Sequence, residues 1–144
     1  MKVSMTGKKT DIWTPFQVRV WALCRRVKAN QITTYGDIAS CLSSSARAVG
    51  TALRRNPLAP TVPCHRVVRT DLGVGGFRGA SHPDSPHVLR KIKILESEGI
   101  IFDPKTRKIS RVCQRIHYDT PPTPAEVASI QRLLAHTGGP QKRT

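Results

Sequence analysis

The chain has 144 residues, 38% of them hydrophobic, which suits one compact domain with a short tail. It contains no apolar stretch close to the roughly 20 residues of a membrane span, and residues 1–10 lack the apolar centre of a signal peptide, which argues against the membrane and secreted classes. We therefore expect an intracellular protein, nuclear in a eukaryotic host and otherwise cytoplasmic. Lys and Arg outnumber Asp and Glu by 24 to 9, a net charge of +15, which favours a nucleic-acid partner unless it only keeps the surface soluble.

The first predicted helix begins at Pro15. Thr14 supplies a capping hydroxyl, Pro15 suits the first helical position, and Gln17 can complete a capping box. An apolar stripe follows at helical spacing, and we expect Asn30 to end the helix. Residues 1–11 are polar and basic, and we expect them to be disordered.

Two short helices are predicted after an extended link at residues 31–33. Thr34 can cap a helix over 35–42, and a basic helix over 46–55 follows a serine-rich turn. A helix, a polar turn and a basic helix form the helix-turn-helix pattern of DNA-binding proteins, although any two short helices can imitate it.

The next segment predicts a winged variant of that motif. Asn56 ends the second helix because a proline follows it. Residues 65–68 predict a short strand, and the glycines within 73–79 predict a turn and a loop. A third helix is expected to begin near Ser85 and to end at Gly99, which can serve as a C-terminal cap.

The C-terminal part predicts a β-hairpin over 100–112 and a short amphipathic helix over 125–136. We therefore expect a mainly α fold with small β elements, a winged helix-turn-helix-like domain with a C-terminal hairpin. The expected divisions are a basic N-terminus (1–11), the domain (12–102), a hairpin extension (103–118) and a proline-rich linker with a short helix and basic tail (119–144).

The four cysteines are Cys24, Cys41, Cys64 and Cys113. They form no CxxC pair, so we expect no structural zinc and no bound metal. Cys24 and Cys41 stand among apolar residues and are expected in the core, whereas Cys64 precedes His65. A thiolate needs a base or a positive field nearby, but a Cys-His dipeptide alone is more often a buried Cys beside a surface His.

The segment from Pro63 to Val67, Pro-Cys-His-Arg-Val, resembles the active-site hallmark of the O6-alkylguanine-DNA alkyltransferases. Other segments resemble further motifs of this family, in the same order and at plausible spacing. These segments are 16–27, 34–39, 46–50, 55–57, and Lys91 with 95–99. The resemblance covers residues 12–102 and implies the alkyltransferase fold.

The resemblance implies direct reversal of DNA damage. An O6-alkylguanine is flipped out of duplex DNA, and its alkyl group passes irreversibly to Cys64, as in a methylated-DNA–[protein]-cysteine S-methyltransferase that reacts once. His65 would remove the thiol proton through a water, Glu98 would orient His65, and Asn56 would hold the turn beside the thiol. The resemblance implies no cofactor.

The resemblance also implies contacts in the minor groove of double-stranded DNA. Arg47 would fill the gap left by the flipped base, and small residues beside it would let the helix approach closely. The expected DNA-binding residues are Tyr35, Ala46, Arg47, Gly50, Arg66 and Arg78, and the expected pocket residues are Tyr35, Val67, Phe77, Arg78 and Gly79. Alternatively, Arg47 is a solvated helix residue, Tyr35 a core residue and Glu98 a plain surface acid.

The chain differs from full alkyltransferases in two respects. We expect it to lack their usual N-terminal domain, and Arg78 resembles a basic residue of the shorter alkyltransferase-like proteins. Those proteins bind O6-alkylguanine without repairing it, recruit excision repair, and usually have Trp or Ala where this chain has Cys64. We expect an active alkyltransferase, because the full reactive set is retained, and a monomer, because the sequence has no spare long apolar stripe. The alternatives are a sensor that recruits excision-repair proteins and a generic winged-helix DNA binder.

Overall fold

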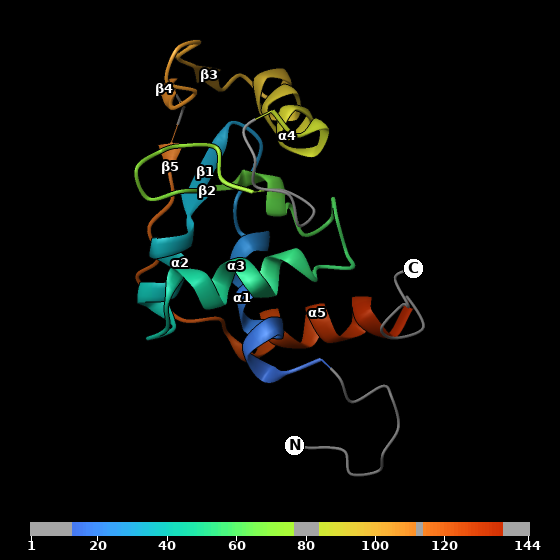
Figure 1. Cartoon of the computed structure of the whole chain (residues 1–144). Coiled ribbons are helices and arrows are strands. Elements are labelled where there is room, and N and C mark those ends of the chain that lie inside the picture. The colour runs from blue at the N-terminus through green and yellow to red at the C-terminus, as the bar shows by residue number, and fades with distance from the viewer. Residues whose placement is uncertain (1–12, 77–83, 112–113, 137–144) are drawn as a thin grey trace.

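The computed structural model of the chain describes residues 13–76, 84–111 and 114–136 (Figure 1). Its helices are α1 (Pro15–Arg25), α2 (Tyr35–Cys41), α3 (Ala46–Arg54), α4 (Pro86–Ser97) and α5 (Pro124–His136), with a 3-10 turn, η3 (Cys64–Arg66). Its strands are β1 (Gln31–Thr34), β2 (Val67–Val68), β3 (Ile101–Phe102), β4 (Ile109–Arg111) and β5 (Gln114–Arg115). The predicted class, mainly helical with small β elements, is confirmed. Residues 1–11, which were predicted to be disordered, lie outside the described residues.

The helices begin where their capping residues stand. The Thr14 hydroxyl accepts a hydrogen bond from Gln17 N at 3.1 Å, and the Gln17 side chain accepts one from Thr14 N at 2.8 Å, so the predicted capping box is present. The Thr34 hydroxyl caps α2 by accepting a hydrogen bond from Asp37 N at 3.0 Å. The first helix is shorter than predicted: it ends at Arg25, and Asn30 lies beyond it with a φ of 68°.

Three short strands form a parallel sheet in the order β2-β1-β5. The strand predicted over 65–68 is present only at Val67–Val68, because the residues before it form the η3 turn. The predicted hairpin is confirmed as the antiparallel pair β3 and β4. The prediction that residues 103–118 extend the hairpin is corrected at β5, which pairs with β1 in the main sheet.

The core has two parts, which lie on opposite sides of the sheet. Helices α1, α2, α3 and α5 enclose the larger part, and α4 with the hairpin encloses the smaller. Successive strand residues face opposite sides, so Val67 packs into the larger part and Val68 into the smaller. Inside the larger part, Trp21 Nε1 donates to the carbonyl of Ala52 at 3.0 Å and links α1 to α3. The η3 turn therefore stands between the two parts of the core.

Two cysteines test the predicted core. Cys24 is completely buried, as expected, whereas Cys41 is half-buried at the edge of the core. Cys113 lies outside the described residues.

Among the described helices, none combines the length and the apolar composition that crossing a membrane demands.

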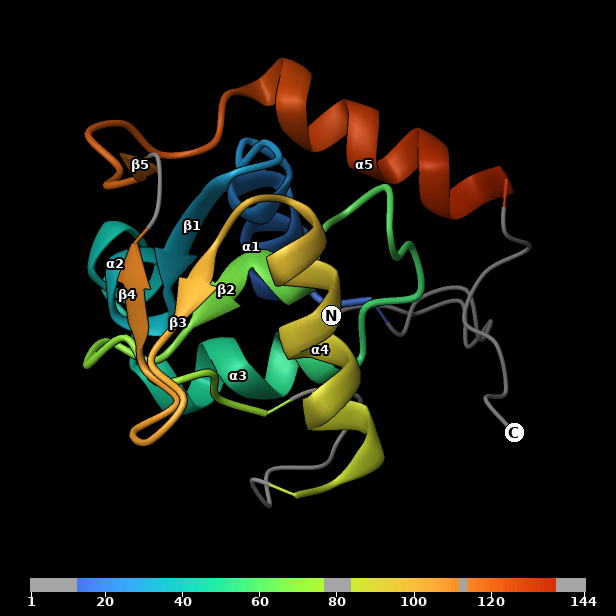
Figure 2. The same ribbon diagram turned by 90° about the horizontal axis from the view of Figure 1, so that it is seen from above.

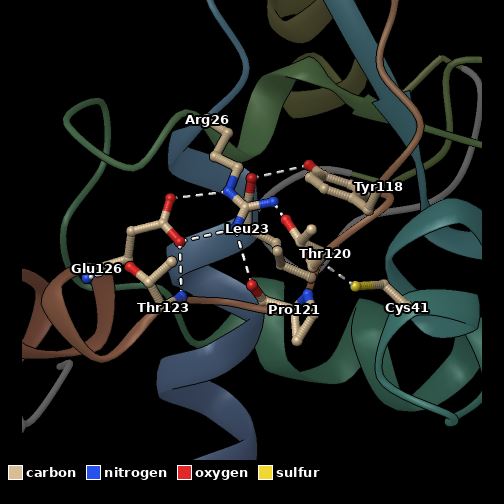
Figure 3. A network of polar contacts seen from close by, with 8 residues as sticks. All are labelled: Leu23, Arg26, Cys41, Tyr118, Thr120, Pro121, Thr123 and Glu126. Atoms are coloured by element: carbon tan, nitrogen blue, oxygen red, sulfur yellow. Dashed lines mark hydrogen bonds and ion pairs between the residues drawn. The ribbon is translucent and has the colours of Figure 1, made fainter.

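The C-terminal segment is fastened to α1 through Arg26 (Figure 3). The guanidinium donates to both carboxylate oxygens of Glu126, at 2.8 and 2.7 Å, and to the carbonyls of Thr120 and Pro121 at 3.0 Å. The Tyr118 hydroxyl donates to Leu23 O at 2.8 Å. Seen from above, α5 runs beside α1 on the side away from α3 and α4 (Figure 2).

Candidate active site

A cleft of about 800 Å³ opens between α3, the loop of residues 69–76 and the turn of the β3–β4 hairpin. Half-buried Cys64 and Tyr35 both line it. Its volume falls within the range of about 300–1,000 Å³ that is usual for small-molecule sites. Cys64 is therefore not fully enclosed by core packing and forms part of the cleft wall.

Asn56 holds the loop that delivers Cys64. Its Nδ2 donates to Val62 O at 2.9 Å, and its Oδ1 accepts from Leu58 N at 2.8 Å. The Cys64 amide donates to the same Val62 carbonyl at 2.8 Å. Asn56 thus shares an acceptor with the backbone of Cys64, which fixes the position of the η3 turn.

His65 and Glu98 form a buried pair behind the cleft, with His65 Nε2 3.0 Å from Glu98 Oε2. An ionised carboxylate only accepts hydrogen bonds, so Nε2 carries the proton and Nδ1 keeps a lone pair. Burial lowers the pKa of His65, and the bond to Glu98 offsets this only in part. At neutral pH the imidazole is therefore uncharged and can accept a proton at Nδ1.

The side chains of Cys64 and His65 leave the turn in different directions. Successive residues of a 3-10 helix are about 120° apart, because the helix has about three residues per turn. His65 is buried, whereas Cys64 lines the cleft. This geometry suits proton transfer through a water molecule.

Arg66 binds both oxygens of the Glu98 carboxylate, including the one that His65 contacts. Its Nε donates to Oε1 at 3.0 Å and its Nη2 to Oε2 at 2.8 Å, while its Nη1 donates to Val27 O at 3.0 Å. The prediction that Arg66 contacts DNA is therefore revised, because its guanidinium is engaged inside the protein. Arg66 instead positions the acid that orients His65.

The end of α4 also places Glu98. Asn30 Nδ2 donates to Glu98 O at 2.7 Å. The next residue, Gly99, has a φ of 96°, and a side chain there would collide with the Asn30 amide. Burial alone would raise the pKa of Glu98, but hydrogen bonds from Arg66 and His65 lower it below its usual value. Glu98 is thus a charged, fixed partner for His65 and not a plain surface acid.

Lys91 belongs to one of the segments that resemble the family, but no role was predicted for it. It is completely buried, and its ammonium donates to Val67 O at 2.7 Å and to Gly76 O at 3.0 Å. Burial lowers its pKa from 10.5 to about 7. A signal was present in the sequence, because Lys91 lies on the apolar stripe of α4, three residues after Val88 and four before Leu95.

Two predicted pocket residues have different outcomes. Tyr35 lines the cleft, with its hydroxyl 3.5 Å from Gly76 O, and burial raises its pKa to about 12, so the phenol is neutral. The expectation that Val67 lines the pocket is wrong, because its side chain is fully buried in the core. Phe77, Arg78 and Gly79 lie outside the described residues.

Helix α3 presents the predicted DNA-contacting residues along one wall of the cleft. Ala46 and Arg47 are exposed, and both line the cleft together with Gly50. A Cβ atom added at Gly50 would meet no atom of the described residues within 4 Å. The interior of the protein therefore does not require a glycine here, which leaves room for close approach by a partner.

The described residues contain no group of three His, Cys, Asp or Glu side chains arranged to hold a metal ion. The reactive apparatus of the cleft consists of the thiol and the imidazole–carboxylate pair. Such a set can generate a thiolate and use it as a nucleophile.

Comparison with known proteins adds to this geometry. The sequence model of the family described as 6-O-methylguanine DNA methyltransferase, DNA binding domain, matches residues 15–100. A methylated-DNA–protein-cysteine methyltransferase of Metallosphaera sedula is 41% identical over 104 residues, which is 67% of this chain and 62% of that protein. The chain spans between 46% and 62% of the length of the curated relatives it matches.

Two solved structures are similar in fold. A crystal structure of Mycobacterium tuberculosis OGT in complex with DNA is 37% identical, with a TM-score of 0.51 over 59% of this chain and 50% of that one. A crystal structure of S. pombe Atl1, in complex with damaged DNA containing O6-carboxymethylguanine, is 24% identical. Its TM-score is 0.54 over 65% of this chain and 84% of that one, which is a likeness of fold alone.

Proposed function

The chain belongs to the 6-O-methylguanine DNA methyltransferase family, and we propose that it repairs DNA by moving the alkyl group of an O6-alkylguanine onto Cys64. The observation that carries this proposal is that Cys64 lines the cleft while the next residue, His65, forms a buried imidazole–carboxylate pair with Glu98. A protein that only bound DNA would have no use for this arrangement.

The reaction begins when Cys64 passes its proton through a water to Nδ1 of His65. The resulting imidazolium is stabilised by Glu98, whose lowered pKa keeps it charged. The thiolate attacks the alkyl carbon, so an S–C bond forms while the C–O6 bond breaks. The bonding electrons pass to guanine, which takes up one proton in balance with the one that Cys64 released and is restored to its normal form. The thioether has no ready leaving group, so each molecule reacts once.

The lesion has to leave the duplex to reach the sulfur, because the O6 substituent is inaccessible inside the base stack. We place α3 in the minor groove, where Gly50 permits close approach and Arg47 fills the gap left by the flipped base. The relative from M. tuberculosis, crystallised with DNA, supports a DNA partner. Binding of this kind reads shape and phosphates, which suits a search for damage without sequence preference.

The test is the fate of the lesion. Duplex DNA with one O6-methylguanine is incubated with the native chain and with Cys64→Ser, and the nucleosides are quantified after digestion. The proposal predicts that the native chain removes O6-methylguanine in a one-to-one ratio and that Cys64→Ser removes none. If the native chain binds the lesion tightly but leaves it intact, the protein is a non-catalytic sensor and the proposal is wrong.

A further inference from the structure

We propose that the turn of the β3–β4 hairpin, residues 105–108, is a second DNA-contacting element that binds backbone phosphates on the wall of the cleft opposite α3. This turn lies outside residues 15–100, the part that matches the family. The inference rests on the proposed function only in taking DNA as the partner of the cleft.

The turn and the nucleophile share one cleft. Lys105, Thr106, Arg107 and Lys108 line the same cleft as Cys64. In Figure 1 the hairpin lies on one side of the loop that follows β2, and α3 lies on the other side. A duplex that rests on α3 and sends a base toward Cys64 therefore brings part of its backbone past the hairpin.

The turn is already ordered by its own hydrogen bonds. Asp103 Oδ1 accepts from Lys105 N at 2.7 Å and from Thr106 N at 3.1 Å, and Asp103 N donates to Lys108 O at 2.8 Å. Ile109 N donates to Leu72 O at 2.9 Å and ties the hairpin to the loop beside the cleft. Because the backbone is held in place, binding loses little conformational entropy beyond that of the lysine side chains.

The charges around the cleft favour an anion. Its lining includes six basic residues, Arg47, Arg54, Arg69, Lys105, Arg107 and Lys108, and two acidic residues, Asp71 and Asp84. The acidic residues pair with Arg69 at 2.9 Å, with Arg107 at 3.2 Å and, more loosely, with Lys108 at 3.9 Å. Within the described part of the chain Lys105 forms no ion pair, and its side chain is exposed. Lys105 is thus the strongest phosphate ligand of the turn, with Lys108 beside it.

The DNA groups that lie nearest to the hairpin turn are backbone phosphates. A flipped nucleotide stays joined to its strand through a phosphate on each side, so those phosphates must lie near the rim of the cleft that receives the base. A lysine ammonium acts as a point charge and binds phosphate without reading sequence. The turn therefore adds affinity for any duplex and no base preference.

The test compares two double variants of the full chain. Lys105→Gln with Lys108→Gln removes the proposed contacts, and Lys28→Gln with Lys93→Gln removes the same charge from exposed positions that do not line the cleft. Binding to a fluorescently labelled, undamaged duplex is measured over a range of salt concentrations. Each lost phosphate contact reduces the steepness of the plot of log K against log salt by about 1. The slope of the first variant is therefore expected to be less steep by about 2, and its binding about tenfold weaker, while the control changes little.

A second measurement separates this inference from the proposed function. Alkyl transfer from a free O6-alkylguanine base to Cys64 does not need DNA, so the hairpin variant is expected to keep the native rate. Equal slopes for the hairpin variant and the control overturn the inference even if transfer is normal. An absence of transfer in the native chain overturns the proposed function, while a lowered slope would still support the hairpin contact. The single variant Lys105→Gln, whose side chain has no described ion pair to lose, must lower the slope by about 1.

Discussion

The reactivity of Cys64 depends on which nitrogen of the His65 imidazole carries the proton. Glu98 accepts from His65 Nε2, so Nδ1 is left as the basic atom. The sequence predicted His65 and Glu98 as a pair, through family resemblance. It could not predict that Arg66 and Asn30 hold the same acid, because both contacts join residues more than thirty positions apart. Only packing brings these residues together.

The variant Glu98→Gln tests this tautomer. A glutamine amide can donate to Nε2, which would move the imidazole proton to Nδ1 and remove the base. We expect transfer to a free O6-alkylguanine base to slow by about 100-fold or more, in line with the usual contribution of a general base. Single-turnover rates measured across pH check this, because a positioning role also moves the pH profile. A native rate and profile would contradict it.

Lys91 gives a prediction about pH and stability. Its pKa is about 7 in the folded chain and about 10.5 when unfolded, so between these values the unfolded chain binds one more proton. The contribution of Lys91 to the free energy of unfolding therefore rises with pH across this window, by at most about 1.4 kcal/mol per pH unit. The stability difference between the native chain and Lys91→Met, measured in urea from pH 7 to 10, should rise accordingly. A difference independent of pH would mean that the buried amine stays charged.

At the scale of elements, the sequence predicted what is encoded locally. Thr14 and Thr34 cap α1 and α2, as expected, and α4 begins beside Ser85, where its start was predicted, because a capping residue acts on amides within its own first turn. The η3 turn and β5 were not predicted. β5 is a strand of two residues that pairs with β1, a segment 83 positions earlier, and such a pairing leaves no local pattern.

Gly50 is a test of what α3 is for. Glycine within a helix costs about 0.5–1 kcal/mol relative to alanine, and no contact with the residues that the structure describes requires it here. We expect Gly50→Ala to raise the free energy of unfolding by about this amount and to weaken duplex binding, because a methyl group would obstruct close approach to the groove. Urea denaturation and fluorescence anisotropy check the two effects. Unchanged DNA affinity would contradict the proposal that α3 lies in the minor groove.

At the scale of the whole molecule, α5 lies beside α1 on the side away from α3 (Figure 2), and we expect it to stabilise the domain. The helix was predicted from its apolar spacing, but its place beside α1 was not. That place depends on Arg26, which reaches residues about a hundred positions later. We expect changes at this contact to alter stability and to leave the chemistry of Cys64 unaffected.

Glu126→Gln tests that contact. A hydrogen bond from Arg26 lowers the pKa of Glu126 from 4.5 to about 2. A lowered carboxyl pKa stabilises the folded chain above the unfolded value, so the contribution is complete above about pH 4.5 and is lost as the pH falls toward 2. We expect the variant to be less stable by about 1 kcal/mol at pH 7, with a smaller deficit at pH 3, measured by urea unfolding. The same deficit at both pH values would contradict an ionic contact.

The central claim concerns one sulfur atom, and mass spectrometry of the Cys64 peptide tests it most directly. After incubation with duplex DNA containing O6-methylguanine, we predict one added methyl group on Cys64 in each reacted chain, and none on Cys24 or Cys41. An unmodified Cys64 peptide after complete binding of the lesion, or a methyl group found on another residue, would contradict the account.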